Sequence, residues 1–341
     1  MIPGADGVRR RRVAGVLMLA IGVAVVLTSA GNVGRSGVAF ARLQDGTDAT
    51  NITCALTAEA SEESATPASA PPVASPVASA SPAPGQPADA ATTAAIERTV
   101  RTLAACLTAG ESETVAQLVT ERYLGAVYGG GGSLSREDYL TLAPDLPDVA
   151  VTVSDVTDVR VESDRRANAE VATVVGNQLV RGRWSFVQAA TGDATGDATT
   201  DAGVRWQVDA VVPLPVAPPA GAARVAVELS DYAFSLSRSS VAGPDVVLAG
   251  TNTGREDHEI LVLRLARGVS TDALLRQPGP GLPEGVTFIG QVTISPGGRA
   301  DLVLVDLPPG SYAIVCLLPT SDGTPHLALG MRARLRVTAP A

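Results

Sequence analysis

The 341-residue sequence contains no lysine, and it has only two histidines, three cysteines and three methionines. Aromatic residues make up 3% of the chain. Arginine is the only strongly basic residue type, and 35 acidic residues outnumber the 26 basic ones, for a net charge of −9. This balance argues against nucleic-acid binding, which relies on basic surfaces. A soft-metal site would have to draw on a very small set of ligands.

The N-terminus lacks an apolar run long enough to span a bilayer. Four arginines at residues 9–12 precede an apolar run of 15 residues, 13–27, whereas a membrane-spanning helix needs roughly 20. This pattern is typical of an export signal. Small residues at 28–30 and 39–41 offer two cleavage sites, and we favour the second, so that residues 1–41 form the signal peptide. An uncleaved N-terminal anchor is the alternative. Both interpretations predict an extracytoplasmic protein, secreted or associated with the cell envelope.

Residues 42–91 are predicted to be a linker, because residues 62–92 are dominated by Ala, Ser, Pro and Thr. This composition offers little side-chain surface to bury and many helix breaks. Removal of residues 1–41 takes away five arginines and one aspartate, which leaves 21 basic and 34 acidic residues in a distinctly acidic chain. Cys54 precedes the Pro-rich segment and Cys106 follows it. The two thiols can pair in an oxidising compartment, but the sequence does not decide whether they do.

Residues 92–217 are predicted to form an α+β domain. Apolar residues recur every three or four positions from Thr92 to about Gly110, which predicts an amphipathic helix, and a second helical pattern covers residues 111–128. Four alternating runs typical of half-buried strands follow, near residues 150–156, 167–175, 182–187 and 204–212. Helices followed by a meandering antiparallel sheet indicate an α+β cone.

This order of elements, with Gly182-Arg-Trp-Ser-Phe-Val before an insert and Trp206-Gln-Val-Asp after it, resembles the NTF2-like (SnoaL-like) superfamily. The resemblance implies a curved sheet that wraps helices around a pocket for a possible small molecule. A catalytic member would usually place an Asp or His in the cone. This segment has no His, so we expect a binding or spacer domain without catalytic residues. Its acids lie in stretches predicted to be solvated loops, at Glu137, Asp138, Asp145 and Asp148.

The insert at residues 191–202 contains three aspartates. Their spacing lacks the alternating ligands and the terminal Glu of a calcium loop, so we expect a solvated hairpin tip.

Residues 222–341 are predicted to form an all-β sandwich. Eight short apolar runs, separated by turn signals, occur in about 120 residues, as in β-sandwich proteins. Both histidines of the chain, His258 and His326, lie in this segment with Cys316 and Met331, at positions that flank the predicted strands. Two imidazoles, one thiolate and a weak axial thioether are the ligands of a trigonal blue-copper site. The pattern therefore predicts that these four residues bind one copper ion.

Two sequence segments are similar to those of the cupredoxin family. Gly310-Ser-Tyr-Ala-Ile-Val-Cys316 resembles the family's Gly-x-Tyr-x-x-x-Cys strand, and His326-Leu-Ala-Leu-Gly-Met331 resembles its His-x4-Met loop. The segment around His258 resembles the first ligand loop of the family. The resemblance implies a Greek-key sandwich, a type 1 copper ion and one-electron transfer to a redox partner that the sequence does not identify.

The segment departs from the family pattern in two places. Nine residues separate Cys316 from His326, more than in plastocyanins and azurins, and Glu259 stands where plastocyanins commonly have Asn. Apolar neighbours of the ligands predict a dry site and a docking patch, with a His ligand as the exit route for the electron. The acidic surface would then attract a basic partner.

Other functions remain open at this level. A copper carrier would hold Cu(I) loosely and exchange it, and a metal-free protein would bind a ligand in the NTF2-like cone or serve as structure. An enzyme working in the cone lacks any catalytic group that we can name. Contact with a membrane is expected only through an uncleaved N-terminal segment.

Overall fold

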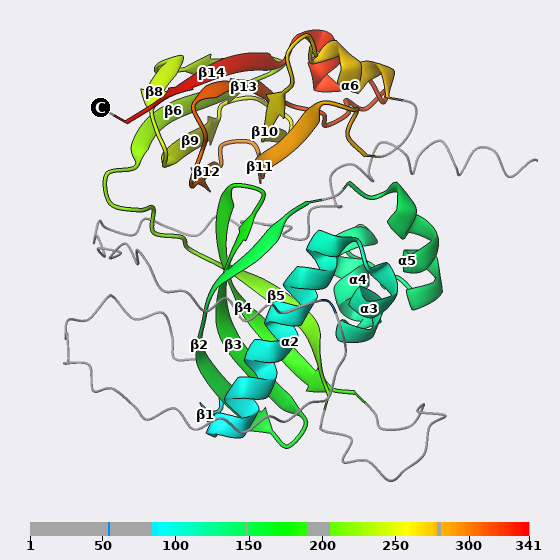
Figure 1. Ribbon diagram of the computed structural model, residues 1–341. Coiled ribbons are helices and arrows are strands. Elements are labelled where there is room, and N and C mark those ends of the chain that lie inside the picture. Colours follow the sequence, from blue (N-terminus) through cyan, green and yellow to red (C-terminus); the bar gives the residue numbers. More distant parts are fainter. Residues whose placement is uncertain (1–53, 55–83, 148, 190–204, 278–280, 341) are drawn as a thin grey trace, which may run out of the picture.

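The structure is a computed structural model that describes residues 54, 84–147, 149–189, 205–277 and 281–340. The predicted signal peptide, most of the predicted linker and the insert at 191–202 lie outside these residues. A helix-and-sheet unit comes first in the chain and a β-sandwich follows it (Figure 1). No helix among the described residues is both long and apolar enough to cross a membrane.

The first long helix, α2 (Ala90–Ala109), matches the predicted amphipathic pattern, with Ile96, Val100 and Leu103 fully buried. Asp89 caps its N-terminus by accepting a hydrogen bond from the Thr92 backbone N–H. Gly110 ends the helix with φ 72°, a left-handed conformation that glycine adopts without steric cost.

The end of the predicted linker is ordered. Residues 86 and 87 form β1 (Gln86–Pro87), which pairs with the edge of β2 (Val151–Ser163), and α2 already begins at Ala90. The first unit therefore starts several residues earlier than the composition of the chain suggested.

The second helical pattern proves to be two helices, α3 (Ser112–Leu118) and α4 (Glu121–Tyr128). The break falls at Val119, whose backbone is extended and forms an isolated bridge to Val208 of the sheet. The prediction of one helix was wrong because a contact with a distant strand overrides the local pattern.

Two short helices, α5 (Arg136–Leu142) and η1 (Ala143–Asp145), precede the sheet. Strands β2 to β5 then pair antiparallel in chain order, and α2 lies across their face (Figure 1). The three later strands are β3 (Arg166–Val175), β4 (Gln178–Gln188) and β5 (Trp206–Leu214). This order, in which helices are followed by an antiparallel meander, is the α+β order expected from the sequence.

Apolar side chains from helices and sheet form the core of the first unit. Burial raises the pKa of Tyr123, Tyr128 and Tyr139 in this core. Asp209 is a buried acid that the sequence analysis did not single out. Its carboxylate accepts a hydrogen bond from the Thr120 hydroxyl at 2.9 Å and pairs with Arg122 at 3.1 Å, so it ties β5 to the start of α4.

The acids that were expected in solvated loops are exposed to solvent but lie in helices where the structure describes them. Glu137 and Asp138 are exposed in the first turn of α5, and Asp145 is exposed in η1. Asp148 lies outside the described residues.

The last third of the chain forms the predicted β-sandwich. One sheet has the strand order β12-β9-β6-β7 and continues through the pairing of β12 with β4 into the sheet of the first unit, and the other has the order β11-β10-β13-β14-β8. The first consists of β6 (Ala223–Ser230), β7 (Ala233–Leu236), β9 (Val246–Asn252) and β12 (Arg299–Leu304). The second consists of β8 (Ser240–Ala242), β10 (His258–Leu265), β11 (Val286–Ile294), β13 (Gly310–Val315) and β14 (Arg332–Thr338).

Three elements of this unit were missed from the sequence. These are the short strand β8, which runs parallel to β14, the helix α6 (Asp272–Arg276) and the 3-10 helix η2 (His326–Leu329). All three are too short to produce a periodic apolar pattern.

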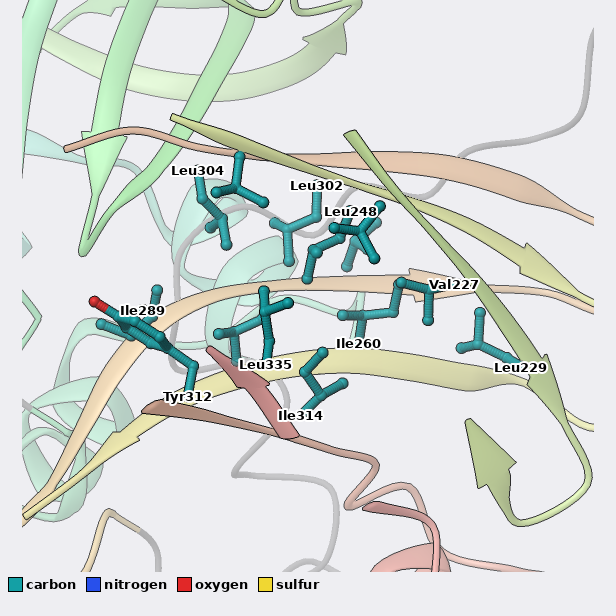
Figure 2. Packing of buried hydrophobic residues seen from close by; sticks show 14 of the residues in the cluster. Val227, Leu229, Leu248, Ile260, Ile289, Leu302, Leu304, Tyr312, Ile314 and Leu335 are labelled. Carbon is teal, nitrogen blue, oxygen red and sulfur yellow. The ribbon is translucent and has the colours of Figure 1, made fainter. Parts of the chain in front are cut away.

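Alternate residues of facing strands fill the interior of the sandwich. Figure 2 shows Val227 and Leu229 of β6 in the same cluster as Ile260 of β10 and Ile314 of β13. Burying one such side chain contributes about 1.5–3 kcal/mol. The core therefore fixes the strand ends from which the loops with the candidate metal ligands emerge.

A disulfide joins Cys54 to Cys106 of α2, with 52 residues of sequence separation. We expect Cys54→Ser to lower the free energy of unfolding by about 2–5 kcal/mol, because the bridge restricts the unfolded chain. Denaturant titration with and without a thiol reductant measures this effect. The reductant should destabilise the wild-type chain and leave Cys54→Ser unchanged; equal stability of the two chains without reductant would contradict the prediction.

Candidate metal centre

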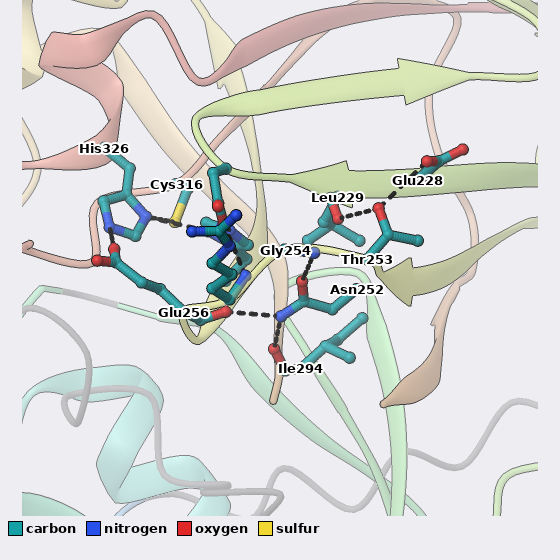
Figure 3. Close-up of polar contacts among 12 residues, drawn as sticks. Glu228, Leu229, Asn252, Thr253, Gly254, Glu256, Ile294, Cys316 and His326 are labelled. Atoms are coloured by element: carbon teal, nitrogen blue, oxygen red, sulfur yellow. Dashed lines mark hydrogen bonds and ion pairs between the residues drawn. The ribbon is translucent and has the colours of Figure 1, made fainter. Parts of the chain in front are cut away.

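Three of the predicted ligands meet at one end of the sandwich. His258 begins β10, Cys316 follows β13 directly, and His326 begins the short helix η2 (His326–Leu329). Their ligand atoms all lie within 4.8 Å of one another, and each residue is at most 1% exposed. Figure 3 shows His326 and Cys316 side by side. The structure therefore brings together residues that are up to 68 positions apart in sequence.

The ligand atoms are spaced to share one ion. The Nδ1 atoms of His258 and His326 are 3.1 Å apart, and the Nδ1 atom of His326 is 3.3 Å from the Sγ atom of Cys316. Nitrogen and sulfur ligands lie about 2.0–2.3 Å from an ion such as zinc, so atoms separated in this way can bind one ion of that size. Two imidazoles with one thiolate suit copper. The residues present therefore fit a copper ion.

Asn252 organises the loop that carries His258. Its buried amide donates hydrogen bonds to the carbonyls of Glu256 at 2.8 Å and Ile294 at 2.7 Å, and its Oδ1 accepts one from the Gly254 N–H at 2.9 Å (Figure 3). These bonds close the turn between β9 and β10 and fix the backbone that leads into His258.

Carboxylates lie beside the ring nitrogens that face away from the cluster. The Nε2 atom of His326 is 3.0 Å from a carboxylate oxygen of Glu256. The Nε2 atom of His258 is 3.5 Å from Asp231, and it makes no hydrogen bond within the described residues, so this second contact is only electrostatic. Carboxylates in such positions orient the imidazole rings and raise their basicity as ligands. Sequence reasoning missed both acids because nothing local distinguishes them from other acids.

Glu259 links His258 to the Cys316 segment. Its buried carboxylate accepts hydrogen bonds from the Leu317 N–H at 2.6 Å and from the Gln291 side-chain amide at 2.7 Å. Its own backbone N–H points to the Cys316 sulfur at 3.4 Å. The residue that departed from the family pattern in sequence is thus a structural part of the centre.

The pKa values of the ionisable groups in this cluster are shifted mainly by burial. Burial raises the pKa of Cys316 to about 12, and the neighbouring charge of Glu259 adds to this rise. Burial also raises the pKa of Glu259 to about 7. The pKa of His326 is lowered, first by burial and then by the neighbouring His258. A neutral imidazole keeps a free lone pair for a metal, whereas the thiol must lose its proton when a metal binds.

Met331 is fully buried in the same core cluster as Cys316. Its N–H donates to the His326 carbonyl at 3.0 Å, and its carbonyl accepts a bond from the Cys316 N–H at 3.3 Å. The backbone of Met331 therefore bonds to two of the three clustered ligand residues. The role of its thioether as an axial ligand stays a prediction.

Side chains cover His326, one of the two histidines that could serve as the expected exit route for the electron. The ring of Tyr232 lies edge-on to His326, with ring centroids 5.0 Å apart, and Glu256 holds the outer nitrogen. Of the apolar neighbours, Leu327 is buried, whereas Leu329 is 46% exposed. An apolar surface residue therefore does lie beside the ligand loop.

A β-sandwich that holds two buried imidazoles and a buried thiol on the loops at one end is cupredoxin-like. Its ligand set defines a candidate copper centre.

No protein-family model matches the sequence, and no curated protein matches it. Dithionite-reduced auracyanin from Roseiflexus castenholzii is 20% identical over 35% of this chain and 99% of that chain, with a TM-score of 0.26. Auracyanin A, a "blue" copper protein from Chloroflexus aurantiacus, is 17% identical over 34% of this chain and 99% of that chain, with a TM-score of 0.25.

The copper nitrite reductase of Nitrosomonas europaea is 15% identical over 40% of this chain and 56% of that chain, with a TM-score of 0.22. The candidate copper centre is inferred from the positions of His258, Cys316 and His326, and not from these similarities.

Gly254 lies against His258. A Cβ atom at this position would come closest to the Asp231 carboxylate, and it would lie 2.7 Å from the His258 Nε2 atom and 3.1 Å from the Asp231 backbone nitrogen. We expect Gly254→Ala to displace the imidazole and to weaken copper binding by about tenfold or more. Competition with a chelator of known affinity measures the change. Gly132→Ala is the control, because a Cβ there meets nothing closer than 3.9 Å; equal affinities of the two variants would contradict this account.

Proposed function

We propose that the chain is an extracytoplasmic cupredoxin-domain protein that binds one type 1 copper ion and transfers single electrons. His258, Cys316 and His326 would hold the ion, with Met331 as the axial ligand. The observation that carries the proposal is the convergence of two imidazole nitrogens and one sulfur in a buried cluster. Copper bound there would supply a one-electron couple, and the chain fixes the geometry around it.

The burial of the ligands favours resident copper over copper carriage. A carrier must release its ion, which requires ligands that another protein can reach. Here both histidines are covered, and the ligand loop is held at each end by backbone hydrogen bonds, from the His326 N–H to Leu318 and from the Met331 N–H to His326. A fixed ligand geometry instead suits an ion that cycles between oxidation states in place.

Two features support an extracytoplasmic location. The chain begins with the pattern of an export signal, and Cys54 and Cys106 form a disulfide, which is typical of proteins in oxidising compartments. We also propose that the helix-and-sheet unit is NTF2-like.

We expect Cu(II) to give the full-length exported chain an intense thiolate-to-copper absorption band in the visible range, and Cys316→Ser to abolish it. Copper should also raise the unfolding temperature, because an ion that binds only the native state at 1,000 times its Kd stabilises it by about 4 kcal/mol. Absorption spectroscopy and thermal unfolding measure the two effects.

Cys54→Ser is the control for the absorption band, because it removes a cysteine of the other unit and should keep the band although it lowers the stability of the chain. A wild-type chain without the band, or a Cys316→Ser chain that keeps it, would exclude a type 1 centre. Copper that binds without the band and passes rapidly to a chelator would instead favour the carrier.

The charge around the ligand end favours a basic redox partner. The pKa of Tyr232, which packs on His326, is raised mainly by burial. The charges of Glu256, Asp231 and Asp322 raise it further. We therefore propose that this acidic rim, defined by the three carboxylates, faces a partner with exposed lysines or arginines.

The rate of reduction by a basic cytochrome should fall by about tenfold or more between 0.01 and 0.15 M salt, because the Debye length shrinks from about 30 to 8 Å. Asp322→Asn should slow this reaction at low salt. The variant removes the charge and keeps an oxygen that can accept from the Thr324 N–H. Stopped-flow absorption measures the rates. Asp145→Asn, in the first unit, is the control, and rates insensitive to salt would exclude the acidic rim as a docking surface.

A further inference from the structure

The two units of the chain meet at the turn between β3 and β4. Figure 1 shows this hairpin reaching toward the sandwich near β11 and β12. Gly176 in the turn has φ +62°, and a Cβ there would come within 3.0 Å of the Ile289 carbonyl oxygen. Glycine at this position therefore allows the turn to lie directly on the backbone of β11.

The turn completes the hydrogen bonding of an edge strand. β11 is the outer strand of its sheet, so one side of its backbone lacks a neighbouring strand. The Asn177 N–H donates to the Ile289 carbonyl at 2.9 Å, and the Gln178 side-chain oxygen accepts from the Gln291 N–H at 2.9 Å. The first unit thus satisfies two backbone groups of β11.

The same turn binds the other sheet of the sandwich. The carbonyl of Asn177 accepts a bond from the Val305 N–H at 2.8 Å, its side-chain amide donates to the Val305 carbonyl at 3.0 Å, and Gln178 pairs with Leu304 of β12. The hairpin therefore bridges the two sheets where the chain passes from β11 to β12.

Apolar residues on both faces of the hairpin pack against the sandwich. Val175 and Val180 share a buried cluster with Val315 and Leu327, the residues next to Cys316 and His326 in sequence. On the opposite face, Val174 and Leu179 pack on Val247, Val303 and Val305. The first unit thus contributes to the apolar cluster that contains the sequence neighbours of Cys316 and His326.

A chain of contacts continues from the turn to the metal ligand Cys316. Gln178 holds the backbone of Gln291, and the Gln291 side chain donates to Glu259. Glu259 in turn accepts from the Leu317 N–H and presents its own N–H to the Cys316 sulfur. Gln178 and Glu259 are both nearly fully buried, so water competes little for these bonds.

From these contacts we infer that the β3–β4 turn is a positioning element of the metal centre. Gln178 of the first unit and Gln291 of the sandwich are positioning residues that act through Glu259 on the Cys316–Leu317 segment. The first unit would therefore influence the copper affinity, the absorption spectrum and the reduction potential of the centre. The inference rests on the proposed copper site and goes beyond it, because it concerns residues that touch neither the ion nor its ligands.

The test compares two substitutions that remove a hydrogen-bonding group and keep a similar volume, Gln178→Leu and Gln291→Leu, in the copper-loaded full chain. Outer partners of metal ligands typically change metal affinity by about 10- to 100-fold when they are replaced. We expect Gln291→Leu to weaken copper binding by about tenfold and to shift the thiolate-to-copper band and the reduction potential. Gln178→Leu should produce a smaller change in the same direction.

Two further variants separate positioning from general destabilisation. Gln178→Glu keeps an acceptor oxygen for the Gln291 N–H and should restore most of the wild-type spectrum and affinity. The double variant should lose less affinity than the sum of the two single losses, because both residues act through Glu259. Gln207→Leu is the control, since the Gln207 side chain donates to the Gln117 carbonyl inside the first unit.

The outcomes separate this inference from the proposed function. If the wild-type chain lacks the absorption band, the copper site itself is wrong. If the wild-type chain has the band and both single variants match its spectrum, affinity and potential, the site stands and the positioning role is excluded. Thermal unfolding of the metal-free variants shows whether each one folds, and should Gln178→Leu be unfolded, Gln291→Leu alone decides.

Discussion

The burial of two imidazoles and one thiol, with their ligating atoms directed at one another, is the constraint on which the rest of the sandwich depends. An unsatisfied buried polar group costs about 1–3 kcal/mol. His258 and His326 are covered, and the outer nitrogen of His258 makes no hydrogen bond within the described residues. Such a cluster is sustained only if its surroundings hold it in place, which is the role of Asn252 in the β9–β10 turn and of Glu259 next to Cys316. A metal ion would satisfy the convergent atoms directly.

The surroundings of the cluster are more negative than its ligand set alone implies. Glu256 and Asp231 lie beside the outer nitrogens of the two imidazoles. Negative charge at short range stabilises the more positive state of a neighbouring ion, and the effect grows as water is excluded. The positions of these carboxylates therefore bear on the oxidation state that a copper ion would prefer here, as well as on the orientation of the rings.

The sandwich and the first unit depend on each other physically. An exposed edge strand has unpaired backbone groups that promote association with other chains. The turn at Asn177 covers such groups on β11, and the hairpin adds apolar side chains to clusters on both outer faces of the sandwich. A chain cut between Leu214 and Ala223 would expose these surfaces. The two units, which composition alone separates into domains, share buried contacts in the folded chain.

The sequence by itself predicted the three residues that cluster and the α+β and β-sandwich character of the two units. Only two histidines exist, and both flank apolar runs of the segment that contains Cys316, so few alternative ligand sets were available. Periodic runs predicted the long helix α2 and the strands of the sandwich other than β8. Only the tertiary structure decided that Cys54 pairs with Cys106, that one helical pattern breaks at Val119, and which few of 35 acids lie beside the centre. The physical reason is that local periodicity reports which side of an element is buried. The side-chain partners of Glu256, Glu259 and Gln178 lie 32 to 113 positions away and meet them only when the strands pair.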